Sequence, residues 1–85
     1  MAYKVWLDKP ADKSLGKLNF KIKEDILIAC TELEQFSERT INIKKLKYPF
    51  IGFRRRVGKY RILFLVNKKK IEIYKIGLRK DVYRI

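Results

Sequence analysis

A two-residue turn in the second half of the chain constrains the fold more than any other sequence feature. Gly58-Lys59 separates two strand-like runs, Ile51–Val57 and Tyr60–Val66, and a glycine in so short a connection is typical of an antiparallel hairpin. A second polar turn, Asn67–Lys70, leads into a third run, Ile71–Ile76. The C-terminal half is therefore expected to form a three-strand antiparallel meander.

The N-terminal half predicts one strand followed by two helices. Polarity alternates over Ala2–Leu7 as in a strand, and Asp8 is a suitable N-cap for a short helix over Lys9–Leu15. A longer helix is expected over Phe20–Phe36, with Asn19 as its N-cap. The residues that recur at helical spacing and predict its buried stripe are Ile22, Ile26, Ala29, Cys30 and Leu33.

This order of elements indicates an α+β domain in which both helices pack on one face of the sheet. The chain has 85 residues, so we expect a single domain, 1–85, with one modest core. Ser37–Phe50 has no clear period and is long for a connector, which makes it a candidate functional loop. Leu27 and Ile28 fall beside the buried stripe, which fits a wide buried face, scattered exposed residues or a partner-binding surface.

The cysteine and histidine content narrows the possible chemistry. The chain has one cysteine, Cys30, and no histidine, which excludes an internal disulfide and an ordinary zinc site. A lone cysteine also favours a reducing compartment. No apolar run approaches the length of a membrane span, and the N-terminus does not resemble a signal peptide. We therefore expect a soluble, cytoplasmic protein without a membrane or metal partner.

The positive charge is concentrated in one part of the sequence. The net charge is +13, yet residues 1–38 carry six basic and seven acidic side chains, whereas residues 39–71 carry twelve basic and no acidic ones. A lysine-rich composition that served only solubility would spread positive charge over all faces. Segregated charge instead predicts a one-sided surface for a polyanion: nucleic acid, an anionic membrane or an acidic protein.

The arginines of the hairpin are expected to gather on one face. Arg54 and Arg56 share a face because strand side chains alternate, and Arg61 begins the next strand close to them. Guanidinium groups so placed repel one another until a phosphate lies between them. Arg55 is expected to point the other way, where its stem would lie along apolar residues or at a strand edge. A solvated basic strand with no ligand is the alternative interpretation.

The hairpin and the last strand resemble a known family. Phe53–Phe64 reads FRRRVGKYRILF and Ile71–Tyr83 reads IEIYKIGLRKDVY. These stretches are similar to the "YRxRVGxYRI" hairpin and the "IxxRxxVY" ending of RelE/ParE-superfamily toxins, and Lys44-Lys45-Leu46 matches as well. The resemblance covers nearly the whole chain. It implies a RelE-like fold and a type II toxin, without metal or cofactor, that a cognate antitoxin holds inactive.

The resemblance also implies an activity and a set of residues. RelE-like members cut mRNA in the ribosomal A site, and the positions that match their active site are Arg54, Arg56, Arg61, Arg79 and Tyr83. Basic and aromatic residues expected to bind RNA are Lys44, Lys45, Lys47, Tyr48 and Lys59. The expected partners are the ribosome, mRNA and a RelB-like antitoxin with an acidic helical segment. The alternatives are a ParE-like poison of DNA gyrase and a basic nucleic-acid-binding module without chemistry.

This chain departs from the family pattern in four places. Leu78 stands where many relatives have histidine or another polar residue, and Arg55 stands at a position that is usually apolar. Some members have lysines where this chain has Arg54 and Arg56. The chain ends two residues after Tyr83, so we expect no C-terminal helix of the kind found in some relatives.

Metal-free RNA cleavage needs a base for the 2′-hydroxyl, cations for the phosphorane and an acid for the leaving 5′-oxygen. Arginines stay protonated at neutral pH, so they can hold the phosphate but are poor bases. Tyr83, whose phenol can give up and take back a proton, is the best acid–base candidate, with simple terminal packing as its alternative role. The general base stays unassigned.

Overall fold

The first helix begins directly after the first strand, at a side-chain cap. In the computed structural model, which describes residues 2–84, strand β1 (Lys4–Leu7) leads into Asp8. The Asp8 carboxylate accepts a hydrogen bond from the Ala11 N–H at 3.0 Å and so caps helix α1 (Lys9–Gly16). The predicted start and cap of this helix are confirmed.

The second helix also begins at its predicted cap but ends earlier than expected. The Asn19 side chain accepts a hydrogen bond from the Ile22 N–H at 3.0 Å, at the start of α2 (Phe20–Glu32). A short 3-10 helix, η1 (Leu33–Gln35), follows it. Phe36 is extended and packs edge-on against three other rings, so tertiary packing ends the helix before this residue. The ring partners of Phe36 are Tyr3, Phe53 and Phe64.

The expected meander is present and is part of a larger sheet. The remaining strands are β2 (Ile43–Lys45), β3 (Phe53–Val57), β4 (Tyr60–Asn67) and β5 (Lys70–Leu78). Their order is β1-β5-β4-β3-β2, with β1 parallel to β5 and every other pair antiparallel. Strand β2 was not predicted. It lies in the expected loop 37–50, and its three residues are too few to show a period.

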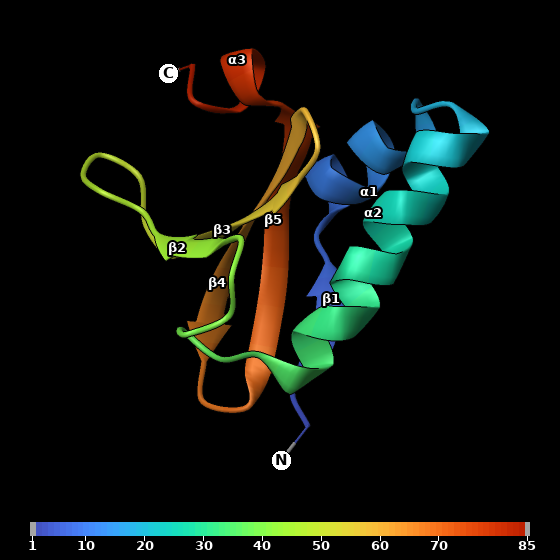
Figure 1. The fold of residues 1–85 in the computed structure, drawn as a ribbon. Coiled ribbons are helices and arrows are strands. Elements are labelled where there is room, and N and C mark those ends of the chain that lie inside the picture. The colour runs from blue at the N-terminus through green and yellow to red at the C-terminus, as the bar shows by residue number, and fades with distance from the viewer. Residues whose placement is uncertain (1, 85) are drawn as a thin grey trace.

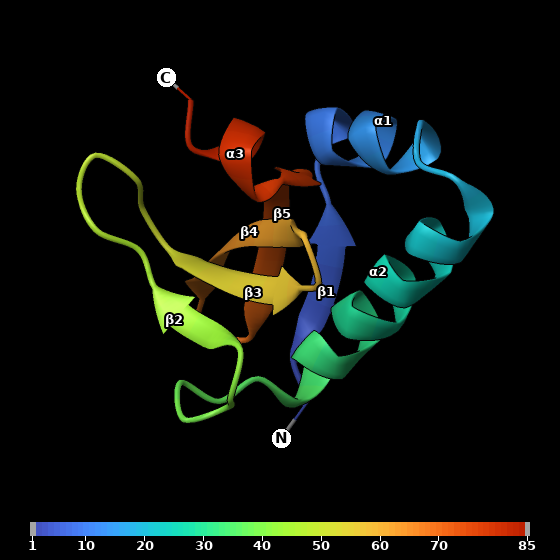
Figure 2. The same cartoon turned by 45° about the horizontal axis from the view of Figure 1, so that its top comes forward.

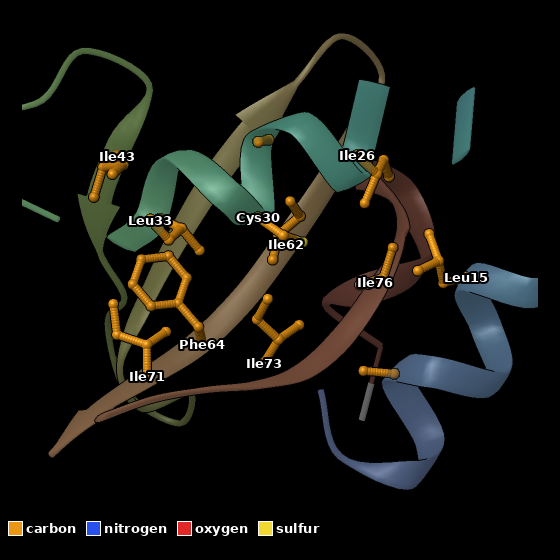
Figure 3. Packing of buried hydrophobic residues seen from close by; sticks show 12 residues of the cluster. Leu15, Ile26, Cys30, Leu33, Ile43, Ile62, Phe64, Ile71, Ile73 and Ile76 are labelled. Carbon is orange, nitrogen blue, oxygen red and sulfur yellow. The ribbon is translucent and has the colours of Figure 1, made fainter. Parts of the chain in front are cut away.

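Helices α1 and α2 lie on the same side of the sheet, as predicted (Figures 1 and 2). Between the layers is a buried cluster that joins α2 to β4 and β5 (Figure 3). Its α2 side includes the predicted residues Ile26, Ala29, Cys30 and Leu33, with Ile22 packed against it. Leu27 and Ile28 are 45% and 54% exposed, which excludes a wide buried face for this helix. None of the helices described is long and apolar enough to cross a membrane.

The chain turns once more after the last strand. A single helical turn, α3 (Arg79–Val82), follows β5 and precedes Tyr83. Val82 is buried against Gly77, where an added Cβ would come within 3.1 Å of a Val82 methyl group. This turn was not predicted, because four residues with three charged side chains carry no helical period. It sets the direction of the two site residues at its ends, Arg79 and Tyr83.

Candidate functional site

Three consecutive arginines in β3 point alternately to the two faces of the sheet. Phe53 and Val57 pack against the core, so Arg55 shares the helix side, and it forms an ion pair with Glu32 of α2. Arg54 and Arg56 therefore lie on the face opposite the helices, as the alternation predicts. The predicted direction of Arg55 is confirmed, whereas its ion pair was not foreseen.

Arg61 lies opposite Arg56 in the hairpin and is held by the turn. It is only 6% exposed, and its Nη1 donates hydrogen bonds to the carbonyl oxygens of Gly58 and Tyr60, each at 2.9 Å. These bonds fix the direction of the guanidinium group, because both acceptors belong to the backbone of the same hairpin.

The pKa of Arg61 reports which charges lie around it. Burial lowers this pKa most, and the nearby charges of Arg56, Arg54 and Arg79 lower it further, while Tyr83 acts in the opposite direction. All five residues of the predicted active-site set are therefore close enough to interact electrostatically. Buried groups with such neighbours are frequent at functional sites.

A hollow of about 520 Å³ lies between the hairpin turn and α3. The Arg79 N–H donates to the Lys59 carbonyl at 2.9 Å, and this backbone bond holds α3 against the turn. In Figure 1, α3 lies close to the turn that joins β3 to β4. The residues that line the hollow are Arg56, Gly58, Lys59, Arg61, Leu78, Arg79 and Lys80.

Four arginines, Arg54, Arg56, Arg61 and Arg79, form the arginine cluster, and no carboxylate of residues 2–84 pairs with any of them. Among residues 2–84 the ion pairs are Lys21–Asp25, Arg55–Glu32 and Arg84–Asp81, which leave out Arg54, Arg56, Arg61 and Arg79. Arg54 also has a buried Nη1 without a hydrogen-bond partner in the described part of the chain. A buried donor without a partner is costly, so this arrangement favours a bound anion that would accept the hydrogen bond.

Tyr83 follows α3 and has a partly packed ring. The ring contacts Phe50 edge-on, with centroids 5.4 Å apart, so the loop between β2 and β3 reaches the site here. Burial raises the pKa of Tyr74, and nearby Tyr83 raises it further. The Tyr83 hydroxyl forms no hydrogen bond with residues 2–84, whereas that of Tyr74 donates to the Ile51 carbonyl at 2.9 Å. The ring of Tyr83 is therefore held by packing, while its hydroxyl makes no hydrogen bond with residues 2–84.

The predicted RNA-binding residues are only partly brought together. Lys59 lines the hollow, and Lys44 is paired with Arg54 in the sheet, so it shares the arginine face. Lys45 is paired with Phe53 and lies on the helix side instead. The register between β2 and β3 decides on which face of the sheet Lys44 and Lys45 lie, and the sequence did not predict this register.

The other two predicted RNA-binding residues, Lys47 and Tyr48, lie in the loop that projects away from the sheet in Figure 2. Tyr48 is 96% exposed. The prediction also omitted residues of the site that carry a charge or support Tyr83. Lys80 lines the hollow, and Phe50 supports Tyr83. The only signal for Lys80 was its position next to Arg79.

Comparison with known proteins identifies relatives by structure rather than by sequence. No family model and no curated protein matches the chain. The RelE–RelB complex of Pyrococcus horikoshii has 27% identity and a TM-score of 0.77, covering 96% of this chain and 100% of that one. The RelB–RelE complex of Methanococcus jannaschii has 28% identity and a TM-score of 0.73, covering 91% and 93%.

A third structure is similar at lower sequence identity. The toxin–antitoxin complex RelBE2 of Mycobacterium tuberculosis has 24% identity and a TM-score of 0.80, covering 93% of this chain and 100% of that one. The fold is thus the α+β fold of RelE-like proteins. The two archaeal complexes, at 27% and 28% identity, support a place for the chain in the RelE-like toxin superfamily.

Proposed function

We propose that this chain is the toxin of a type II toxin–antitoxin system and that it cleaves mRNA in the ribosomal A site, without a metal ion, and so inhibits translation. The observation that carries the proposal is the hollow lined by Arg56, Arg61 and Arg79. Arg54 and Tyr83 lie in electrostatic range of Arg61, and no carboxylate of residues 2–84 pairs with the arginines. The structural neighbours, which were solved as toxin–antitoxin complexes, support the toxin class.

The chemistry would be a transesterification within the RNA. The 2′-oxygen attacks the adjacent phosphorus while its proton passes to water, and the bond between phosphorus and the 5′-oxygen breaks to leave a 2′,3′-cyclic phosphate. The phosphorane between these states carries extra negative charge. Arg56, Arg61 and Arg79 would stabilise that charge, and preorganised donors of this kind contribute roughly 3–4 kcal/mol each. Arg61 suits this role because its backbone hydrogen bonds hold it in place before RNA arrives.

Tyr83 would donate the proton that the leaving 5′-oxygen requires. Its hydroxyl is free of protein hydrogen bonds within residues 2–84, and the nearby arginines would stabilise the phenolate that forms. No arginine is a suitable base for the 2′-hydroxyl, since the guanidinium group stays protonated. Alignment of the mRNA by the ribosome would therefore supply much of the rate enhancement.

The proposal includes a location and two kinds of partner. Cleavage at the A site places the protein in the cytoplasm, in contact with ribosomes and mRNA. The antitoxin is expected to present an acidic helical segment, because the charge of residues 39–71 is entirely positive. Such a segment would silence the toxin by covering or distorting the arginine cluster.

Primer extension on mRNA from an in vitro translation reaction tests the activity. The purified chain should produce cuts at A-site codons, and Arg79→Ala should lower the cleavage rate roughly 100-fold, as loss of one transition-state donor does. Arg39→Ala is a matched control, because it removes an exposed arginine that does not line the hollow.

Other outcomes would point to other functions. DNA breaks that depend on gyrase, without mRNA cuts, would support the gyrase poison. Salt-dependent RNA binding without any cleavage would indicate a binding module. Rapid cleavage of free RNA would contradict the dependence on ribosomes.

A further inference from the structure

Arg55 occupies a position where the sheet is otherwise apolar. Its neighbours across the two flanking strands are Ile43 in β2 and Ile62 in β4, and both are buried. The Arg55 side chain is only 16% exposed, yet the Glu32 carboxylate at the end of α2 accepts from its Nη2. A charged side chain among apolar neighbours loses its hydration and needs a partner of opposite charge, and Glu32 is that partner.

The second hydrogen bond of Arg55 is made to the backbone of its neighbour in sequence. Its Nη1 donates to the Arg56 carbonyl oxygen at 2.8 Å. Strand β2 begins at Ile43, and Asn42 beside it has a φ of 76°, so the ladder ends here. The Asn42 carbonyl accepts from the Arg56 N–H at 2.8 Å, but the Asn42 N–H does not return a bond to the Arg56 carbonyl. Arg55 therefore satisfies a carbonyl that the sheet leaves open.

We propose that Arg55 is a positioning residue: anchored by Glu32, it holds the backbone of Arg56 at the end of β3 and thereby sets where the Arg56 guanidinium stands in the hollow. The inference rests on the proposed function, because it gives Arg56 a role in RNA cleavage. Arg56 is itself exposed and has no hydrogen bond from its side chain to residues 2–84, so its backbone is the part that the protein holds.

The geometry of the guanidinium group suits this position better than the ammonium group of a lysine. Two nitrogens of one planar guanidinium reach two acceptors at once, the Glu32 carboxylate and the Arg56 carbonyl. A lysine at position 55 keeps the charge that faces Glu32 but has one nitrogen at the end of a flexible stem. Arg55→Lys therefore tests the positioning role and leaves the net charge unchanged.

The test measures cleavage on programmed ribosomes together with the folded fraction of each variant. Arg55→Lys should lower kcat about tenfold or more at unchanged KM, because a small displacement of a catalytic group is costly. Glu32→Gln, which keeps an acceptor but loses the charge, should have an intermediate effect. Arg39→Lys is the matched control and should leave kcat unchanged. A kcat equal to that of the wild type, once corrected for the folded fraction, would show that Arg55 only stabilises the fold.

An NMR measurement separates this inference from the proposed function. The side-chain Nε–H and guanidinium N–H resonances of Arg56 should shift and broaden in Arg55→Lys and stay in place in Arg39→Lys, whether or not the protein cleaves RNA. If the wild type does not cleave but these resonances move, the nuclease proposal fails and the positioning contact stands. If the Arg56 resonances are unchanged in Arg55→Lys, the positioning role is overturned, whatever the activity of the wild type.

Discussion

At the scale of one residue, Arg61 is a buried charge that the protein keeps in the candidate site although burial and repulsion lower the stability of the fold. Among residues 2–84 it is the one charged or polar residue that is buried, and its burial and three other arginines lower its pKa. A carboxylate partner would relieve that repulsion, but the protein uses two backbone carbonyls instead. The guanidinium thus keeps its charge for an external anion, which is the pattern expected of a preorganised site rather than of a stabilising ion pair.

Cys30 provides a test of the core at the same scale. Burial raises the pKa of its thiol from 9.0 to about 11, and the charge of Arg55 lowers it by less. The folded state therefore holds the proton more tightly than the unfolded state does. The stability that this provides is complete below pH 9 and is lost as the pH rises towards 11.

We expect the free energy of unfolding to fall by roughly 2–3 kcal/mol more in the wild type than in Cys30→Ala over this pH range. Chemical denaturation at several pH values measures the difference. Both proteins contain the same tyrosines and lysines, so their titration cancels in the comparison. Parallel pH profiles would contradict a buried thiol.

At the scale of elements, the loop between β2 and β3 depends on Gly52. Its φ is +92°, and an added Cβ would lie 2.2 Å from the Phe64 carbonyl oxygen of β4. Gly52→Ala combines backbone strain with a clash against another strand, so it should lower the free energy of unfolding by about 2–4 kcal/mol in urea denaturation. Gly16→Ala is the matched control, because nothing lies within 4 Å of its Cβ position, and it should stay within about 1 kcal/mol of the wild type. Equal losses in both variants would show that the close packing at Gly52 is unimportant.

The elements that sequence could predict are those with a local signal. The turn at Gly58-Lys59 and the caps Asp8 and Asn19 are local, and each is present. Strand β2 and helix α3 are three and four residues long, so they arise from contacts with other elements rather than from a period.

The candidate site also has a part that local sequence patterns predict and a part that depends on contacts between distant residues. Alternation along β3 was enough to place Arg54 and Arg56 together, and this part was predicted from the residues themselves. The approach of Arg79 to the hairpin depends on a backbone bond to Lys59, twenty positions earlier, and only the family resemblance suggested it. The role of Glu32 as the partner of Arg55 needed the structure, because the two residues are 23 positions apart.

At the scale of the whole molecule, positive charge collects on the sheet, and the helical layer is nearly neutral. Residues 39–71 form β2, β3 and β4 and carry twelve basic side chains without an acidic one, whereas residues 1–38 are close to balance. The part of this charge that Lys44, Arg54, Arg56 and Arg61 carry lies on the face away from the helices, where like charges repel and destabilise the folded chain. A polyanion on that surface should therefore stabilise the protein, both by general screening and by binding in the hollow.

Sulfate can serve as the test anion, because it resembles a phosphate in charge and shape. Matched ionic strength and two charge variants separate its binding in the hollow from general screening. At an ionic strength matched with chloride, sulfate should raise the Tm of the wild type, by roughly 4–8 °C for each kcal/mol of binding free energy in a domain of this size. Arg56→Ala/Arg79→Ala should lose much of this gain. Lys9→Ala/Lys13→Ala, which removes the same charge from α1, should keep it. Scanning calorimetry gives the comparison, and equal gains in all three proteins would mean that sulfate acts by screening or exclusion and that the hollow holds no anion.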